Sequence, residues 1–271
     1  MLTSPRPTSR RPARSFEYFD RPFAAMAHRG GWDDASRAPL ENSLKAFQYA
    51  VDELGYSYLE TDVHATSDGV LVALHDSVLD RVTDQAGRVA DLPWAQVRTA
   101  RIAGTEPVPT MNEIFEALPE ARFNIDIKEE NAIVPLVEAI RRHHAQSRVC
   151  VASFSPARLS RFRSRMGPDV AIAASIDVVA WSAYVPLLPG LLNAGVQAFQ
   201  IPMSQKIGPV RLPVLTRHLL SVAKKRDMRI HVWTIDEETQ MNELIDFGVD
   251  GIVSNRIDVL KQISSEHGLW C

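Results

Sequence analysis

The sequence predicts an α/β fold of the (βα)8 TIM-barrel type, in which eight strand–helix units close into one barrel. Eight short apolar segments alternate with eight helical patterns along the chain. The apolar segments are rich in Val, Ile, Ala and Phe without clean alternation, which is typical of parallel strands buried on both faces. A doubly wound open sheet is the alternative, but no G-x-G-x-x-G loop follows the first segment.

Each predicted strand is followed by apolar residues at helical spacing. In the first helix these residues fall on one stripe, with Asn42 or Ser43 expected as the N-cap. Gly195 and Gly248 stand where two of the helices should stop. The expected strands are residues 24–28, 58–62, 123–128, 149–154, 170–176, 198–202, 230–234 and 251–254. The expected helices are residues 43–54, 111–118, 132–144, 156–166, 181–194, 213–226, 237–247 and 257–265.

One further strand, at residues 70–75, does not fit the repeat. It follows the second strand after residues 67–69, a gap that is too short for a parallel crossover and suits a hairpin. A turn centred on residues 68 and 69 would place Asp62 opposite His75. The hairpin would therefore fold His75 back beside the carboxylates of the second strand.

One barrel domain is predicted over residues 23–271, with a small insertion at about 77–108. Residues 1–22 are predicted to be a flexible basic tail. No apolar run follows the start of this tail, so it does not form a secretory signal, and a peripheral contact with anionic lipid headgroups stays open. No apolar run is long enough for a transmembrane helix.

The composition gives little support for several classes of partner. A net charge of -3 gives no indication of a nucleic-acid partner. The two cysteines, Cys150 and Cys271, do not form a disulfide framework, and a cytoplasmic location is expected. Cys150 lies in an apolar segment and is predicted to be a buried free thiol.

Polar residues gather where the predicted strands end, and they are far fewer where the strands begin. Catalytic groups of barrels of this type lie at the carboxyl ends of the strands, so the pattern predicts a reaction centre at that mouth. The residues at the strand ends are His28, Arg29, Glu60, Asp62, Asp126, Lys128, Ser153, Phe154, Gln200, Trp233, Thr234, Ser254 and Asn255.

Three carboxylates are expected to converge at this mouth. Glu60 and Asp62 point to the same side of the second strand, and Asp126 comes from the third strand. Oxygen ligands without a thiolate favour a hard divalent cation, Ca²⁺ or Mg²⁺, over zinc. The alternative is an ion-pair network in which Arg29 and Lys128 neutralise the carboxylates. Left unpaired, each buried carboxylate would cost several kcal/mol, so a cationic group is expected among them.

Arg29 and Lys128 beside a cation indicate a bound anion, because Arg forks onto phosphate oxygens and Lys acts as a point charge. With a metal they would stabilise negative charge on a pentavalent phosphorus. His28 and His75 are then candidates for a general acid and a general base on either side of the phosphorus. The other six histidines are interpreted as structural.

Two more residues have both a functional and a structural interpretation. Glu41 could orient His28, reach the metal through water, or serve the N-terminus of the first helix. Trp233 could form an apolar wall for a polyol or alkyl group of the substrate, or pack in the core.

The chain resembles the glycerophosphodiester phosphodiesterases in segments that follow the same order from about residue 24 to 260. So many segments in one order are far more specific than a single motif. The matching segments are AHRG (27–30), PLENS (39–43), LETDVHATSDGVLVALHD (59–76), LDRVTD (79–84), PTMNE (109–113), NIDIK (124–128), SFSP (153–156), VWTID (232–236) and GVDGIVSNR (248–256).

The resemblance implies a (βα)8 barrel that hydrolyses a glycerophosphodiester to glycerol 3-phosphate and an alcohol with the aid of Ca²⁺ or Mg²⁺. It also implies that the two histidines form the acid/base pair and that the arginine and lysine side chains bind the phosphate. The implied residues are His28 and His75, Arg29 and Lys128, and the metal ligands Glu60, Asp62 and Asp126.

Two positions depart from the family pattern. The third metal ligand is often Glu in the family, whereas this chain has the shorter Asp126, which puts metal position or preference in doubt. The closing segment often carries Thr-Asp where this chain has Ser254 and Asn255. This second change leaves the last strand without a carboxylate at that position.

Several alternatives stay open. A related enzyme could act on lipid head groups, either as a lysophospholipase D or through a cyclic phosphate. An apolar rim on the insertion would then be supplied by Leu79, Val82, Leu92, Trp94 and Val97. A non-enzymatic barrel would need one of the key polar residues to be lost, and none is. Metal-assisted enolisation would place its carboxylates on strands three to five. The head-group alcohol, the metal, the acid–base assignment and the oligomeric state are not fixed by the sequence.

Overall fold

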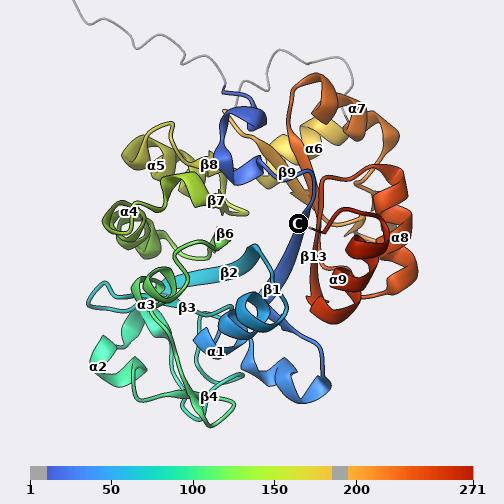
Figure 1. The fold of residues 1–271 in the computed structure, drawn as a ribbon. Coiled ribbons are helices and arrows are strands. Elements are labelled where there is room, and N and C mark those ends of the chain that lie inside the picture. Colours follow the sequence, from blue (N-terminus) through green and yellow to red (C-terminus); the bar gives the residue numbers. More distant parts are fainter. Residues whose placement is uncertain (1–10, 185–194, 271) are drawn as a thin grey trace, which may run out of the picture.

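The computed structural model describes residues 11–184 and 195–270. Within them, eight parallel strands form a nearly closed barrel surrounded by helices (Figure 1), so the predicted fold class is confirmed. The two end strands of the sheet approach each other where the Gln197 N–H donates to the Ile172 carbonyl at 2.8 Å. In spatial order the strands are β8 (Ala171–Ile172), β7 (Val149–Ala152), β6 (Arg122–Ile127), β2 (Tyr58–Ala65), β1 (Ala24–Trp32), β13 (Gly251–Arg256), β12 (Arg229–Val232) and β9 (Ala198–Ile201).

Helices cover the outside of this sheet (Figure 1). The first begins where the Ser43 hydroxyl accepts from the Ala46 N–H, as predicted for a Ser cap. The third begins with a capping box between Thr110 and Glu113. The helices are α1 (Leu44–Gln48), continued by a π-helical turn (Tyr49–Glu53), α2 (Trp94–Val97), α3 (Met111–Ala117), α4 (Ile133–Arg142), α5 (Pro156–Met166), α6 (Ile176–Tyr184), α7 (Arg217–Lys225), α8 (Glu238–Phe247) and α9 (Ile257–Glu266).

The main hydrophobic core lies between the barrel sheet and the helices. Phe47 of α1 and Phe115 of α3 both meet Phe123 of β6 edge to face, with ring centroids 6.5 and 5.4 Å apart. Cys150 is a buried free thiol, as predicted. No helix in the described ranges has the length and apolar composition needed to cross a membrane.

The amino ends of the barrel strands are covered by residues 13–19, which form two short 3₁₀ turns, Ala13–Ser15 and Glu17–Phe19. Phe16, Tyr18 and Phe19 are buried there, and the Tyr58 hydroxyl donates to the Tyr18 carbonyl at 2.6 Å. The predicted flexible tail over residues 1–22 is therefore wrong for residues 13–19, whose aromatic side chains gain a buried site. Residues 1–10 of that prediction lie outside the described residues.

The hairpin after β2 exists, but its predicted register is wrong by one residue. Its second strand is β3 (Leu71–Ala73), and Val63 pairs with Ala73. Thr66 and Val70 close the turn through their backbone, and the Thr66 hydroxyl also accepts from the Val70 N–H at 2.9 Å. Because this turn holds three residues rather than two, Asp62 meets Leu74 instead of His75.

Residues 77–108 contain the 3₁₀ turn Val89–Asp91, α2, and the small hairpin of β4 (Arg101–Ile102) and β5 (Glu106–Pro107). Their own apolar cluster includes the buried Leu79, Val97 and Ile102. This segment packs beside the hairpin of β2 and β3 (Figure 1). It therefore supports His75 from the outside of the barrel.

Two expected helices differ from the observed ones. The helix expected at 181–194 is instead α6, which begins at Ile176, and the expected residues 185–194 lie outside the described part of the chain. The helix expected at 213–226 begins only at Arg217, because an antiparallel hairpin of β10 (Ser204–Ile207) and β11 (Val210–Pro213) comes before it. The sequence analysis did not predict this hairpin.

Candidate active site

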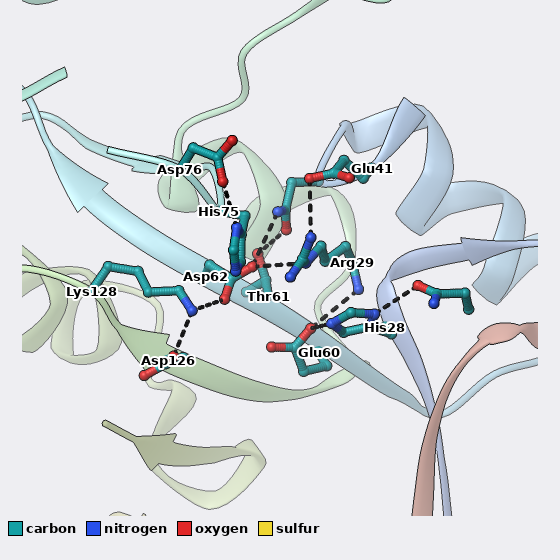
Figure 2. A network of polar contacts seen from close by, with 12 residues as sticks. His28, Arg29, Glu41, Glu60, Thr61, Asp62, His75, Asp76, Asp126 and Lys128 are labelled. Atoms are coloured by element: carbon teal, nitrogen blue, oxygen red, sulfur yellow. Dashed lines mark hydrogen bonds and ion pairs between the residues drawn. The ribbon is translucent and has the colours of Figure 1, made fainter. Parts of the chain in front are cut away.

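A cavity of about 410 Å³ opens at the carboxyl ends of the strands. The predicted catalytic, phosphate-binding and metal-binding residues all line it, and so does Trp233. Glu41 does not line it and lies behind Arg29, and the strand-end residues Ser254 and Asn255 do not line it either. Figure 2 shows the polar residues of one side gathered on β1, β2, β6 and the β3 hairpin. The polar residues that line the cavity on these elements are His28, Arg29, Glu60, Asp62, His75, Asn124, Asp126 and Lys128.

Strand register brings the polar residues of three strands side by side. His28 of β1 is paired with Glu60 of β2, and Asp62 of β2 is paired with Asp126 of β6. Because parallel strands present paired residues to the same face, these side chains all enter the barrel mouth. The expected convergence of the three carboxylates from two neighbouring strands is thus present.

The chain turns sharply after His28. Arg29 has a φ of 55° and Gly30 a φ of 90°, which is a left-handed conformation. A Cβ on Gly30 would lie 2.7 Å from the Cβ of Ala46, so a glycine lets the first helix pack closely against this turn. The turn directs the Arg29 side chain toward Glu41 and Asp62 (Figure 2).

Ion pairs join the two cations to the carboxylates (Figure 2). Lys128 Nζ lies 2.8 Å from Asp62 Oδ1 and 2.7 Å from Asp126 Oδ2. Arg29 Nε lies 3.2 Å from Asp62 Oδ2, and Arg29 Nη1 lies 3.3 Å from Glu41 Oε1. Burial alone would raise the pKa of Asp62, but Lys128 and Arg29 hold it below its ordinary value. Asp62 is therefore the ionised centre of the network.

Glu60 and Asp126 are less well neutralised. Burial and the Asp62 carboxylate raise the pKa of Glu60 well above its ordinary value. Glu60 Oε2 accepts the backbone N–H of Arg29, at 3.2 Å, and lies 3.7 Å from His28 Nε2. Burial also raises the pKa of Asp126, and its Oδ1 has no hydrogen-bond partner in the part of the chain that the structure describes. The three carboxylates at the mouth are thus only partly neutralised by the positive charges of Arg29 and Lys128.

His28 is held from behind by two residues of other elements. Its Nδ1 lies 2.7 Å from Asn255 Oδ1, and Asn255 Nδ2 donates to Asp236 Oδ2 at 2.8 Å. Since the Asn255 amide donates to Asp236, its oxygen faces His28 and accepts from Nδ1–H. Burial and the neighbouring Arg29 lower the pKa of His28 to about 4. His28 is therefore neutral near pH 7, with Nε2 free of a proton.

His75 has a carboxylate partner. Its Nδ1 lies 2.6 Å from Asp76 Oδ1, and its backbone carbonyl lies 3.1 Å from the ring of His64. Arg81 donates to Asp76, which lowers the pKa of Asp76 to about 2, and donates to Glu41 at 2.6 Å. One chain of contacts therefore links His75 to Arg29 through Asp76, Arg81 and Glu41.

The sequence analysis missed four residues of this network: Asn255 and Asp236 behind His28, and Arg81 and His64 beside His75. A signal for all four was present, because each lies in a segment that matches the family. His64 lies in LETDVHATSDGVLVALHD, Arg81 in LDRVTD, Asp236 in VWTID and Asn255 in GVDGIVSNR. Asn255 was noted only as a strand end. His64 was interpreted as structural, and its contact with the His75 backbone keeps it in a supporting position.

The side chains of the candidate site are not arranged as a metal-binding site in this structure. Across residues 11–184 and 195–270, no cluster of three or more His, Cys, Asp or Glu is arranged to hold a metal ion. Lys128 lies between Asp62 and Asp126, where a cation would be expected (Figure 2). The ion-pair network that the sequence offered as the alternative is present, and the divalent cation stays a prediction.

The other side of the cavity is apolar. Trp233 lines it as predicted and meets Phe154 edge to face, with ring centroids 5.9 Å apart. Further apolar residues come from the segment after the short β8 strand, from α6, and from the end of β9 and the segment after it. The cavity therefore joins a charged half to an apolar half. The fold and this site define a TIM barrel whose mouth combines two histidines, three carboxylates and two cationic side chains in one cavity, an arrangement typical of an enzyme active site.

The comparisons with known proteins agree with this class. The model of the glycerophosphoryl diester phosphodiesterase family matches residues 28–259. The probable glycerophosphodiester phosphodiesterase 2 of Mycobacterium tuberculosis is 38% identical over 254 residues, which cover 91% of this chain and 92% of that protein. The chain therefore belongs to the glycerophosphoryl diester phosphodiesterase family and is a phosphoric diester hydrolase.

Two more relatives extend the comparison. The lysophospholipase D GDPD1 of Rattus norvegicus is 26% identical over 276 residues, 88% of this chain and 84% of that protein. The solved structure of an Oleispira antarctica phosphodiesterase in complex with the product sn-glycerol-3-phosphate has a TM-score of 0.72 at 23% identity, and the match covers 90% of this chain and 96% of that one. This structural likeness supports the barrel fold.

Proposed function

We propose that this enzyme hydrolyses glycerophosphodiesters to glycerol 3-phosphate and an alcohol, with His28 and His75 as its acid/base pair. The observation that carries the proposal is that both histidines, Arg29 and Lys128 line one cavity in a barrel of this family. The Oleispira antarctica relative was solved with glycerol 3-phosphate, which supports the same product here. The proposed reaction places the enzyme in lipid and glycerol metabolism.

Arg29 and Lys128 would bind the phosphate of the substrate. Both are half-buried at the mouth, and both now contact Asp62. A phosphate that enters between them can accept charge-assisted hydrogen bonds from a guanidinium fork and an ammonium group. The same donors would stabilise the additional negative charge that develops on phosphorus as a nucleophile attacks.

Two observations support a hard divalent cation bound by the carboxylates. Among the described residues, Asp126 Oδ1 is buried without a hydrogen-bond partner, and the side chain nearest to Glu60 Oε2 in an ion-pair position is His28, at 3.7 Å, which is neutral near pH 7. Oxygen donors of this kind suit Ca²⁺ or Mg²⁺. Glu60, Asp62 and Asp126 would hold the ion, which when bound supplies Lewis-acid polarisation of the phosphate oxygens. Lys128 would then turn from Asp62 and Asp126 to the substrate.

The contacts of the two histidines suggest how the proton moves. Asn255 fixes the proton of His28 on Nδ1, so Nε2 can take a proton from the attacking water. Asp76 accepts from Nδ1–H of His75 and stabilises an imidazolium that can protonate the departing alkoxide. The water oxygen bonds to phosphorus, the bond to the head-group oxygen breaks, and the alcohol leaves with the proton of His75.

The proposal is tested with purified enzyme on glycerophosphocholine and glycerophosphoethanolamine, by measuring release of glycerol 3-phosphate with EDTA and with added Ca²⁺ or Mg²⁺. We expect EDTA to stop release, either metal to restore it, and His75→Ala to abolish it. His267→Ala, at a surface histidine that contacts Asn242, is the matched control and should retain full activity. Release that persists in EDTA and in His75→Ala would contradict the metal and the acid/base role.

A second candidate keeps the site and changes the substrate. The apolar half of the cavity and the rat lysophospholipase D relative favour a lipid substrate, as the sequence analysis left open. A reaction that stops at a cyclic phosphate formed by the substrate's own hydroxyl is distinguished by product analysis in ¹⁸O-labelled water. The cyclic product would carry no label, whereas direct attack yields glycerol 3-phosphate with one label. A cytoplasmic location stays a prediction.

A further inference from the structure

Arg81 joins two reactive groups of the mouth from outside the cavity. Its Nη1 and Nη2 donate to Glu41 Oε2 and Oε1 at 3.0 and 2.6 Å, and its Nε donates to Asp76 Oδ2. Glu41 in turn accepts from Arg29, and Asp76 accepts from the ring of His75 (Figure 2). Arg81 itself does not line the cavity. It therefore reaches the reactive groups through these two carboxylates.

The guanidinium of Arg81 contacts both carboxylates at once. Because the group is planar and its donors point in fixed directions, it sets where Glu41 and Asp76 lie relative to each other. Burial alone would raise the pKa of Glu41, but Arg81 and Arg29 hold it below its ordinary value. Arg81 also lowers the pKa of Asp76 to about 2. Both carboxylates are thus ionised at neutral pH and act as acceptors.

The backbone that carries Arg81 is anchored in the insertion. Leu79 is buried in the apolar cluster that the insertion shares with Val72 of β3. Its carbonyl accepts from the backbone N–H and the hydroxyl of Thr83 at 3.0 and 2.9 Å, and its N–H donates to the Gly87 carbonyl at 3.0 Å. Arg81 lies in the middle of this closed turn. The insertion thus contributes a side chain to the site, although none of residues 77–108 lines the cavity.

We propose that Arg81 is a positioning residue, which holds Asp76 for proton transfer by His75 and holds Glu41 for phosphate binding by Arg29. This inference rests on the proposed function, because His75 and Arg29 keep the roles given there. Without Arg81, Asp76 can turn toward water, and the His75 ring loses its fixed orientation toward the departing alkoxide. Glu41 likewise loses the contact that directs it to Arg29. The first effect lowers kcat and the second raises KM, so the two are measured separately.

The test compares two substrates whose leaving groups need different help, in the assay described above with added Ca²⁺ or Mg²⁺. Glycerophosphocholine releases an alkoxide that requires a proton, whereas the p-nitrophenyl ester of glycerol 3-phosphate releases a phenolate that leaves without one. Arg81→Gln should lower kcat roughly thirtyfold for glycerophosphocholine and less than about threefold for the p-nitrophenyl ester. Its KM should rise roughly threefold to fivefold for both. Equal losses of kcat on the two substrates, or an unchanged kcat, would overturn the inference.

Two further variants separate the two contacts from the charge. Glu41→Gln leaves the contact between Arg81 and Asp76 in place, so it should raise KM for both substrates with little change in kcat, and an unchanged KM would contradict the link to Arg29. Arg81→Lys keeps the positive charge without the planar fork, and it should recover no more than about threefold of the lost kcat. Full recovery by lysine would show that charge alone is sufficient and would overturn a positioning role.

Arg88→Gln is the matched control. Arg88 belongs to the same insertion, is about as exposed as Arg81, pairs with Glu129 at 2.9 Å and does not line the cavity. Its kcat and KM should equal those of the wild type on both substrates, because an exposed ion pair contributes little by itself. Thermal melting verifies that each variant remains folded.

His75→Ala separates this inference from the function on which it rests. Like Arg81→Gln, it should lose more activity on glycerophosphocholine than on the p-nitrophenyl ester. If His75→Ala shows this difference and Arg81→Gln does not, only the role of Arg81 is refuted. If His75→Ala loses the same factor on both substrates, the acid role of His75 fails, and the role of Arg81 fails with it. No hydrolysis of either substrate by the wild type would refute the proposed function itself.

Discussion

The two ends of the barrel are built on opposite principles. At the carboxyl ends of the strands, Glu60 and Asp126 are buried with too little positive charge nearby, and Asp126 Oδ1 has no hydrogen-bond partner within residues 11–184 and 195–270. At the amino ends, Phe16, Tyr18 and Phe19 close the barrel with buried aromatic rings. The first arrangement costs folding free energy and the second supplies it. Function and stability are thus located at separate ends of one sheet, as is general for barrels of this type.

The largest expected effect comes from removing a charge at the mouth. Glu60→Gln should lower kcat/KM roughly a thousandfold, because a proposed cation ligand is lost. In EDTA the same variant should be more stable at pH 7, by about 1–2 kcal/mol, because a buried carboxylate with a raised pKa is replaced by a neutral amide. Activity assays and urea unfolding measure the two effects on the same preparation.

Glu53→Gln is the control for this prediction, because Glu53 is an exposed carboxylate at the end of the π-helical turn. It should leave both activity and stability within about 0.5 kcal/mol of the wild type. If Glu60→Gln destabilised the enzyme in EDTA, the buried Glu60 carboxylate would not lower the folding stability. The proposed contrast between the two ends of the barrel would then be wrong.

A change at the amino end should have the reverse pattern. Tyr18 is buried, and its ring meets Phe19 and Tyr58 edge to face at 4.8 and 5.3 Å. Tyr18→Ala should lower the free energy of unfolding by about 3–4 kcal/mol and leave kcat/KM of the folded enzyme unchanged. Urea unfolding and steady-state kinetics give the two values.

Tyr18→Phe sharpens that result, because the Tyr18 hydroxyl is buried and has no hydrogen-bond partner among the described residues. The ring is retained and an unsatisfied polar atom is removed, so stability should stay the same or rise by about 1 kcal/mol. A loss as large as that of Tyr18→Ala would mean that the hydroxyl, and not the ring packing, closes this end.

A smaller effect on activity is expected from the residue behind His28. Asn255→Ala removes the acceptor of Nδ1–H, so His28 can rotate or take the other tautomer, and kcat should fall roughly thirtyfold with little change in KM. Asn255→Asp keeps an acceptor at that position and should recover most of kcat, although it places a second carboxylate beside Asp236. Equal loss in both variants, or a loss confined to KM, would contradict a positioning role.

The sequence predicted the barrel because the strands carry a strong local signal. Each barrel strand is buried on both faces, and this produces the apolar runs that were recognised at all eight positions. The gathering of polar groups could be predicted from the strands alone, because the carboxyl ends of parallel strands meet at one mouth of the barrel. In the structure, strand register places His28 beside Glu60 and Asp62 beside Asp126. These parts of the fold and site depend on local pattern and topology.

The parts that were missed depend on contacts between distant segments. The aromatic residues at 16–19 look like a tail because their partners, such as Tyr58, come from elsewhere in the chain. The hairpin register differs because the Thr66 hydroxyl accepts from the Val70 N–H and widens the turn by one residue. The Asp236–Asn255–His28 contacts join three separate strand ends. Composition and periodicity carry no signal for such side-chain pairs.

A small effect is also expected in the pH dependence of stability, which His231 influences inside the barrel. His231 is buried against Phe19, and burial together with Arg229 lowers its pKa to about 3. The unfolded chain binds a proton at His231 below about pH 6.5, and the folded chain does not until about pH 3, so stability falls as pH drops through this window. His231→Gln should therefore lose about 1–2 kcal/mol less than the wild type between pH 7 and pH 5, measured by urea unfolding at both values. If both proteins lost the same amount, the closed end would be insensitive to acid, and the pH dependence would have to originate in His28 and His64, whose pKa values burial also lowers.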